Sequence, residues 1–125
     1  MNDITEVISS KDSESILNSI KKMLGPTSDD THFDADLIIH INSVFAILSQ
    51  MGVGPKDGFS IQDDSTLWSS YIDGPEMQMV KSYMYLKVRL IFDPPTNSSV
   101  MDSTNKLIDE YEWRLHVGGD KRTMN

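Results

Sequence analysis

Residues 83–95 decide the fold, and they read Tyr83-Met84-Tyr85-Leu86-Lys87-Val88-Arg89-Leu90-Ile91-Phe92-Asp93-Pro94-Pro95. The stretch is apolar all round, although Lys87 lies within it, and such a helix is typical of the centre of a bundle. The helix stops at Asp93-Pro94-Pro95, because a proline keeps the residue before it out of the helical region and lacks the N–H that would continue the turn. The sequence therefore predicts a central helix that starts at Gly74-Pro75, with the proline in its first turn.

The rest of the chain also shows apolar residues at helical spacing, between capping residues and breakers. The core stripe expected on the second helix consists of Phe33, Leu37, Ile41, Val44 and Leu48. The stripe expected on the last helix consists of Val100, Met101, Thr104, Leu107, Ile108, Tyr111 and Leu115. The expected helices cover residues 12–24, 31–51, 75–93 and 98–117, with a short one over 65–72. Asp12 or Ser13, residues 29–31, and Ser98 or Ser99 supply the expected caps. We therefore expect an all-α fold, a small bundle of four main helices plus one short helix, with a turn-like or hairpin-like loop near residues 53–63.

The length and composition fit one compact domain. The chain has 125 residues, of which 38% are hydrophobic and 24% charged, and a domain of this size buries roughly two-thirds of its unfolded surface. Gly118-Gly119 is expected to end the last helix. The predicted organisation is an N-terminal arm over residues 1–11, a helical domain over 12–117 and a flexible C-terminal tail over 118–125.

Charge and cysteine content narrow the class of protein. The net charge is −8, which opposes tight binding to nucleic-acid phosphates. There is no cysteine, so disulfides and thiolate chemistry are excluded, as suits synthesis in a reducing cytosol. No signal-peptide pattern or apolar run of about 18 residues occurs. We expect a soluble protein without a membrane partner.

A family resemblance rests on two segments. The first is the stretch over residues 83–95, and the second is residues 38–45, Ile-Ile-His-Ile-Asn-Ser-Val-Phe, followed by Gly52-Val53-Gly54. From about Ser13 to about His116, the chain resembles the head-tail connector (adaptor) proteins of tailed bacteriophages, which are related to the DNA-packaging connector family. The resemblance lies in the order, the spacing and the residue character of these segments.

The resemblance implies a structural role in the virion. Connectors of this kind form a ring of about twelve copies below the portal protein, continue the DNA channel and offer a docking face to the next neck, stopper or tail-completion protein. Genomic DNA would pass through without sequence-specific binding. The C-terminal segment, here Gly118 to Asn125 with Lys121 and Arg122, would reach toward the portal. The implied location is the host cytoplasm during assembly and then the head-tail junction.

Lys87 conflicts with its position. At 100° per residue it lies among Val80, Tyr83 and Ile91 on the expected buried side of its helix. Burying an unpaired ammonium costs several kcal/mol. We expect Lys87 either to pair with Asp34 or Glu112 or to extend its amine to the solvent.

Trp113 also conflicts with its position, because it falls among Asp102, Lys106 and Asp109 on the polar face of the last helix. It is either an anchor for a subunit contact or a ring that the short helix or the loop covers. Ile39 and Ala46 form a weaker apolar patch on the outer side of their helix. These three residues, with Lys121 and Arg122, are the predicted interface residues.

The charges are unevenly distributed along the chain. Residues 1–36 hold eight acidic and three basic side chains, whereas Lys81, Lys87 and Arg89 outnumber Glu76 and Asp93 in the central helix. The acidic first part of one copy and a basic stripe on the central helix of the next could meet head to tail in a ring. A solvated charged surface is the simpler explanation.

Catalysis has no support in the sequence. His32, His40 and His116 are isolated, and no hydrolase motif or phosphate-binding loop occurs. The acidic residues near 29–36 and 57–64 lack calcium-loop spacing and are better explained as helix caps. We expect no enzyme activity, cofactor or metal. The competing interpretation is a small acidic inhibitor that mimics DNA and blocks a nucleic-acid enzyme.

Overall fold

The computed structural model describes residues 15–25 and 31–124, with side chains described through Gly118. These residues form α2 (Ile16–Leu24), α3 (Asp34–Gln50), the 3-10 turn η1 (Trp68–Ser70), α4 (Met77–Phe92) and α5 (Ser98–Met124). No β-strand occurs in this part of the chain, where Ser15 and Leu67 form an isolated bridge. The prediction of an all-α bundle with four main helices is confirmed. None of the described helices has both the length and the apolar character that a membrane span needs.

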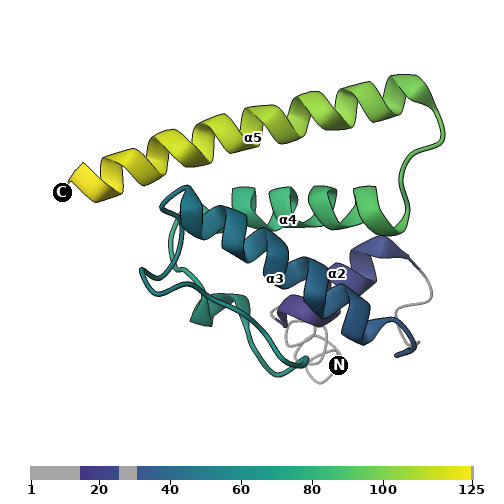
Figure 1. The fold of residues 1–125 in the computed structure, drawn as a ribbon, viewed down its shortest axis with the longest axis horizontal. Coiled ribbons are helices and arrows are strands. Elements are labelled where there is room, and N and C mark those ends of the chain that lie inside the picture. The colour runs from purple at the N-terminus through teal and green to yellow at the C-terminus, as the bar shows by residue number, and fades with distance from the viewer. Residues whose placement is uncertain (1–14, 26–30, 125) are drawn as a thin grey trace, which may run out of the picture.

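α4 is the centre of the arrangement and contacts α2, α3 and α5. α5 runs along one side of α4 in the opposite direction, while α2 and α3 lie on the other side (Figure 1). At 1.5 Å per residue, the 27 residues of α5 span about 40 Å and the 16 residues of α4 about 24 Å. The C-terminal part of α5 therefore projects beyond the bundle.

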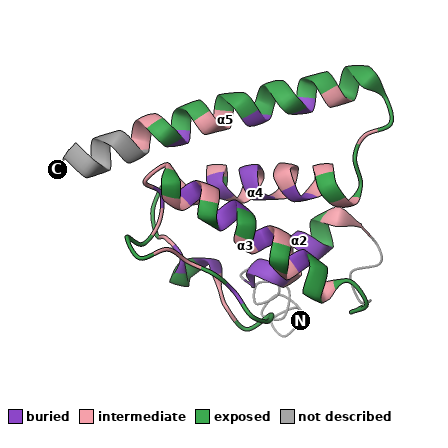
Figure 2. Cartoon of the chain, in the orientation of Figure 1, coloured by how far each residue is buried: buried purple, intermediate pink, exposed green. Residues whose placement is uncertain are grey.

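The core forms where the apolar stripes of the helices meet. Figure 2 shows the buried residues on the sides of α2, α3 and α4 that face one another, and only a few on α5. Along α4 the fully buried residues are Val80, Tyr83, Met84 and Val88, which follow helical spacing. The helix ends at Phe92 with Asp93 as the C-cap, directly before the prolines. The predicted central helix is thus the core element.

The loop between α3 and α4 is ordered by aromatic rings and by one amide. Tyr71 packs against Phe45 and Phe59 with ring centroids 4.7 and 5.0 Å away. The Asn42 side chain donates to the Ile61 carbonyl at 2.9 Å and accepts from the Ile61 N–H at 2.8 Å. These bonds replace the partners that a strand would have supplied, so the segment near residues 53–63 is a loop, without a β-hairpin ladder.

The start of α2 is fastened to the end of this loop. Ser15 caps α2 by accepting from the Asn18 N–H at 3.2 Å, and its hydroxyl donates to the Asp64 carbonyl at 2.7 Å. The Ile16 N–H donates to the Thr66 carbonyl at 3.0 Å. One serine therefore satisfies a helix terminus and joins two segments that lie 49 residues apart in the sequence.

Several predicted boundaries were wrong. Ser15 caps the first described helix, whereas Asp12, Ser13 and the predicted arm over residues 1–11 lie outside the described residues. α3 begins at Asp34 without a side-chain cap, and the predicted short helix is only the turn Trp68–Ser70. Asn97, not Ser98 or Ser99, caps α5 by accepting from two backbone N–H groups.

α5 also continues further than predicted. It runs through Gly118 and Gly119 to Met124, so the two glycines do not end it. A glycine inside a helix costs only about 1 kcal/mol relative to alanine, which the intact hydrogen-bond ladder on either side can offset. The prediction that residues 118–125 form a flexible tail remains untested, although residues 118–124 are helical.

Candidate protein-interaction surfaces

A polar cluster joins α4 to α5 at the level of Lys87. The Tyr83 hydroxyl donates to Glu112 Oε2 at 2.7 Å, and Lys87 Nζ lies 3.9 Å from the same oxygen. Burial and the Glu112 carboxylate together hold the pKa of Tyr83 well above its usual value of 10.0. Lys87 remains 29% exposed, so its charge is paired at the margin of the core and is not fully buried. The cluster fixes the position of α5 on α4.

Asp34, the other carboxylate considered for Lys87, pairs with Lys21 instead. Lys21 Nζ lies 2.8 Å from Asp34 Oδ1, and the lysine side chain is only 8% exposed. That buried oxygen has no hydrogen-bond partner among the described residues, so the ion pair with the ammonium is its compensation. The pair ties the end of α2 to the start of α3.

Trp113 is not covered by the part of the chain that the structure describes. Its side chain is 67% exposed, on the side of α5 opposite Ile108 and Leu115, which are buried. Neither the 3-10 turn nor the loop folds over it. Beside it, Arg114 Nη2 lies 2.8 Å from Glu110 Oε1 in an exposed ion pair. An exposed indole beside a neutralised charge pair is the composition expected of a contact surface.

The other predicted interface residues lie on different elements. Ile39 is 60% exposed, and Ala46 is exposed on the same outer side of α3. Ile39 and Ala46 lie seven residues apart, which places them on one helix face two turns apart. Lys121 and Arg122 belong to α5, beyond the side chains that the structure describes.

A partly exposed aromatic cluster, which the sequence did not predict, lies between α3 and α4. Phe33, expected in the core stripe, is 51% exposed and lies edge-on to Phe92 with centroids 6.4 Å apart. His40 contacts the same Phe92 ring at 5.3 Å. Helical spacing could not reveal this cluster, because it forms where the start of α3 meets the end of α4.

The flank of α5 carries a second missed surface. Val100 and Leu107 were expected to face the core, but they are 45% and 38% exposed. They line a groove of about 280 Å³ with three hydroxyl residues: Ser99, Ser103 and Thr104. We call this set the α5 groove. It consists of uncharged side chains.

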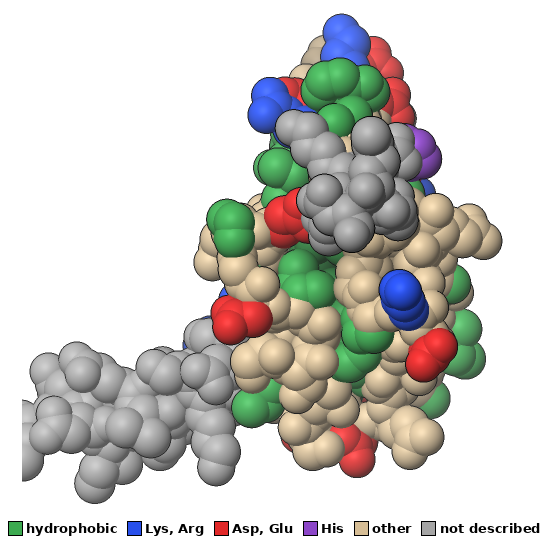
Figure 3. All heavy atoms as spheres, turned by 90° about the vertical axis from the view of Figure 1, so that its left-hand side faces the viewer, with side chains coloured by type: hydrophobic (Ala, Val, Ile, Leu, Met, Phe, Trp, Pro, Cys, Tyr) green, Lys and Arg blue, Asp and Glu red, His purple; other side chains and the backbone are tan. Residues whose placement is uncertain are grey.

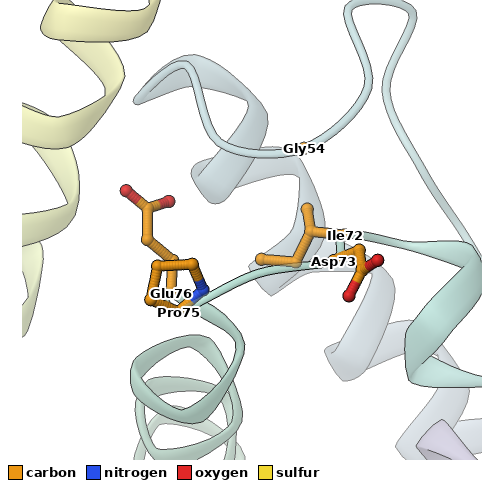
Figure 4. Close-up of a pocket in the computed structure, with 5 residues that line it drawn as sticks. All are labelled: Gly54, Ile72, Asp73, Pro75 and Glu76. Carbon is orange, nitrogen blue, oxygen red and sulfur yellow. The ribbon is translucent and has the colours of Figure 1, made fainter.

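A larger hollow of about 480 Å³ lies where the loop meets the start of α4, lined by Gly54, Ile72, Asp73, Pro75 and Glu76 (Figure 4). The carboxylates of Asp73 and Glu76 point away from each other, so they do not form an acid–base pair or a cation site. Within the described residues, no three His, Asp or Glu side chains gather as metal ligands. Asp63 instead accepts from the Ser65 N–H and hydroxyl, which lowers its pKa.

The predicted basic stripe on α4 is divided by the fold. Lys81 lies over the Trp68 ring at 5.9 Å, while Lys87 turns toward α5 and Glu112. On the side of the molecule from which α5 projects, acidic and basic side chains are interspersed with hydrophobic ones (Figure 3). This face therefore shows neither a continuous basic stripe nor the long acidic stripe that a DNA mimic needs.

The geometry is that of a small helical protein with several exposed apolar surfaces and no assembled reaction site among its described residues. Comparison with curated proteins and with solved structures found no match. A family model described as "phage connector protein" matches residues 16–122, which span α2 to nearly the end of α5. The match confirms the resemblance seen in the sequence: the chain belongs to the phage connector protein family.

Proposed function

We propose that the protein is a head-tail connector that forms a ring below the portal protein of a tailed phage. The observation that carries the proposal is the family match over residues 16–122. In this role the protein extends the DNA channel and provides the docking face for the next neck or tail protein. Its work is contact between proteins, and the family is a structural one.

Subunit contacts in this ring would use the exposed apolar residues. Trp113 on α5 and the pair Ile39 and Ala46 on α3 lie on helices that flank α4 on different sides. Head-to-tail contacts, in which such a surface meets an unlike surface of the next copy, close into a ring when the rotation between copies is right.

The charge suits a channel that DNA crosses. A ring of about twelve copies at −8 each would carry about −96 formal charges before screening. An acidic wall does not hold phosphates, so the DNA can slide. The portal contact would involve the C-terminal end of α5, where Lys121 and Arg122 lie.

The test is assembly with the portal. Purified protein is mixed with purified portal protein, sized by light scattering and imaged by negative-stain electron microscopy. We expect a ring coaxial with the portal. A protein that stays monomeric and does not bind the portal would contradict the proposal, and copurification of such a monomer with a nucleic-acid enzyme would support the DNA-mimic alternative.

Trp113 offers a simple optical readout of the same event. Trp68 is 2% exposed, and its indole N–H donates to Ser19 Oγ at 2.8 Å, so the quencher acrylamide reaches mainly Trp113 in the monomer. If Trp113 lies in a subunit contact, quenching falls as the ring forms. The variant Trp113→Phe is the control, since its remaining fluorescence should not respond to assembly.

A further inference from the structure

The apolar sector of α5 is wider than the surface that α4 covers. Thr104, Ile108 and Leu115 are buried, whereas Val100 and Leu107 on the adjoining flank remain 45% and 38% exposed. Removing such side chains from water is favourable, at about 25 cal/mol for each Å² of apolar surface. Binding of a partner that covers this flank would therefore be favourable.

The side chains that line the α5 groove favour one kind of bound group. Val100 and Leu107 supply apolar contact, and the hydroxyls of Ser99, Ser103 and Thr104 supply hydrogen-bond acceptors. A flat apolar ring with one N–H fits both properties. The protein already contains this pairing, because Ser19 Oγ accepts from the buried Trp68 indole at 2.8 Å.

Trp113 is a matching side chain on the same chain. It is 67% exposed, and the neighbouring Arg114 is neutralised by Glu110, so burying the indole does not strand a charge. Trp113 cannot reach its own groove. It lies about 9 Å along α5 from Leu107 and about 120° around the helix, given 1.5 Å and 100° per residue.

We propose that the α5 groove receives Trp113 of a neighbouring copy, so that the α5 helices of adjacent copies pack side by side. Each copy gives one indole and offers one groove, on different faces of the same helix. Used head to tail, this contact leaves each copy one groove or one indole for its other neighbour, so it continues from copy to copy until the ring closes. The inference rests on the ring of the proposed function and adds the contact that joins its subunits.

Cross-linking tests the contact directly, because the chain has no native cysteine. Ser103→Cys places a thiol in the groove, and Asp109→Cys places one a turn before Trp113 while leaving the indole in place. The two single variants are mixed with portal protein and oxidised. We expect a disulfide between the two variants, and its loss when Trp113→Ala is added to Asp109→Cys.

Two results would overturn the contact. One is a dominant cross-link of Asp109→Cys to itself, which would indicate a two-fold contact. The other is a cross-link of Asp109→Cys to Ala46→Cys in preference to Ser103→Cys, which would make the outer side of α3 the acceptor.

Assembly measurements separate this inference from the proposed function. Trp113→Ala removes the indole, and Ser103→Trp fills the groove. Both positions are exposed, so the thermal unfolding of the monomer should change little. Each variant should raise the concentration for half-assembly about 30-fold or more, the effect of losing a hot-spot residue. Asp102→Asn, also exposed on α5, is the matched control and should assemble normally.

The outcomes are distinct. If the wild-type protein forms the ring and both variants assemble equally well, the groove contact is wrong and the connector function stands. If the wild-type protein forms no ring with the portal, the proposed function itself fails.

Discussion

At Gly54, the cost of backbone strain can be separated from the cost of side-chain overlap by comparing two substitutions, Gly54→Ala and Gly58→Ala. Gly54 and Gly58 have φ angles of +86° and +88°, so alanine at either position pays a similar cost of about 1–2 kcal/mol for a positive φ. A Cβ at Gly54 would lie 2.5 Å from Tyr71 Cε1, while a Cβ at Gly58 would meet no atom within 4 Å. Only the first substitution disturbs the core.

The extra cost of Gly54→Ala follows from Tyr71. This ring is 4% exposed and packs against Phe45 and Phe59, so it cannot move away freely. Overpacking of this kind costs about 1–3 kcal/mol. We expect Gly54→Ala to lower the free energy of unfolding by that amount more than Gly58→Ala does, equivalent to roughly 4–12 °C in melting temperature for a chain of this length.

Urea unfolding followed by far-UV circular dichroism measures both variants. Repeating the Gly54→Ala substitution in a Tyr71→Leu background completes a double-mutant cycle, and the extra cost should then largely disappear. Equal destabilisation by Gly54→Ala and Gly58→Ala, or an extra cost that persists without the tyrosine ring, would refute the packing argument.

Three further predictions concern polar contacts and exposure. Tyr83→Phe should cost about 1–2 kcal/mol, since it removes the hydrogen bond to the charged Glu112. The pKa of Tyr83 is raised in the folded protein, so its contribution to the free energy of unfolding is complete below pH 10 and is lost as the pH rises further. In urea unfolding, the stability of the wild-type protein should therefore fall more steeply above pH 10 than that of Tyr83→Phe. Asp34→Asn should destabilise more than Lys21→Met, by about 1–2 kcal/mol, because it leaves a buried ammonium unpaired whereas the methionine removes that charge; equal midpoints in urea would contradict this. Trp113→Ala should change the monomer's free energy of unfolding in urea by less than about 0.5 kcal/mol, since the ring is 67% exposed, and a larger loss would show that the ring packs within the chain.

Much of the fold could be predicted from local patterns. The apolar run before Pro94 predicted the central helix, and α3 was predicted from its stripe of Leu37, Ile41, Val44 and Leu48, all of which are buried. Helix ends were predicted less well, because nearby residues compete as caps. Asn97 caps α5 in place of Ser98 or Ser99, because its side-chain oxygen accepts hydrogen bonds from two backbone N–H groups.

The candidate surfaces were predicted only in part. Trp113 stood out as a large apolar residue among polar neighbours and Ile39 as part of an apolar patch on the outer side of its helix, and both are exposed. Val100, Leu107 and Phe33 did not stand out, because each continues an apolar stripe. A stripe shows which side of a helix is apolar, but not how much of that side a neighbouring helix covers.

By itself, the sequence determined the helices, their order and the membership in the connector family, because helical periodicity, prolines and caps act over a few residues. Only the tertiary structure decided which carboxylate meets Lys87, which glycine touches a buried ring and which apolar residues remain in water. These outcomes depend on distances between segments far apart in the chain, such as Tyr83 and Glu112. Local propensities carry no information about such distances, since packing of the whole bundle sets them.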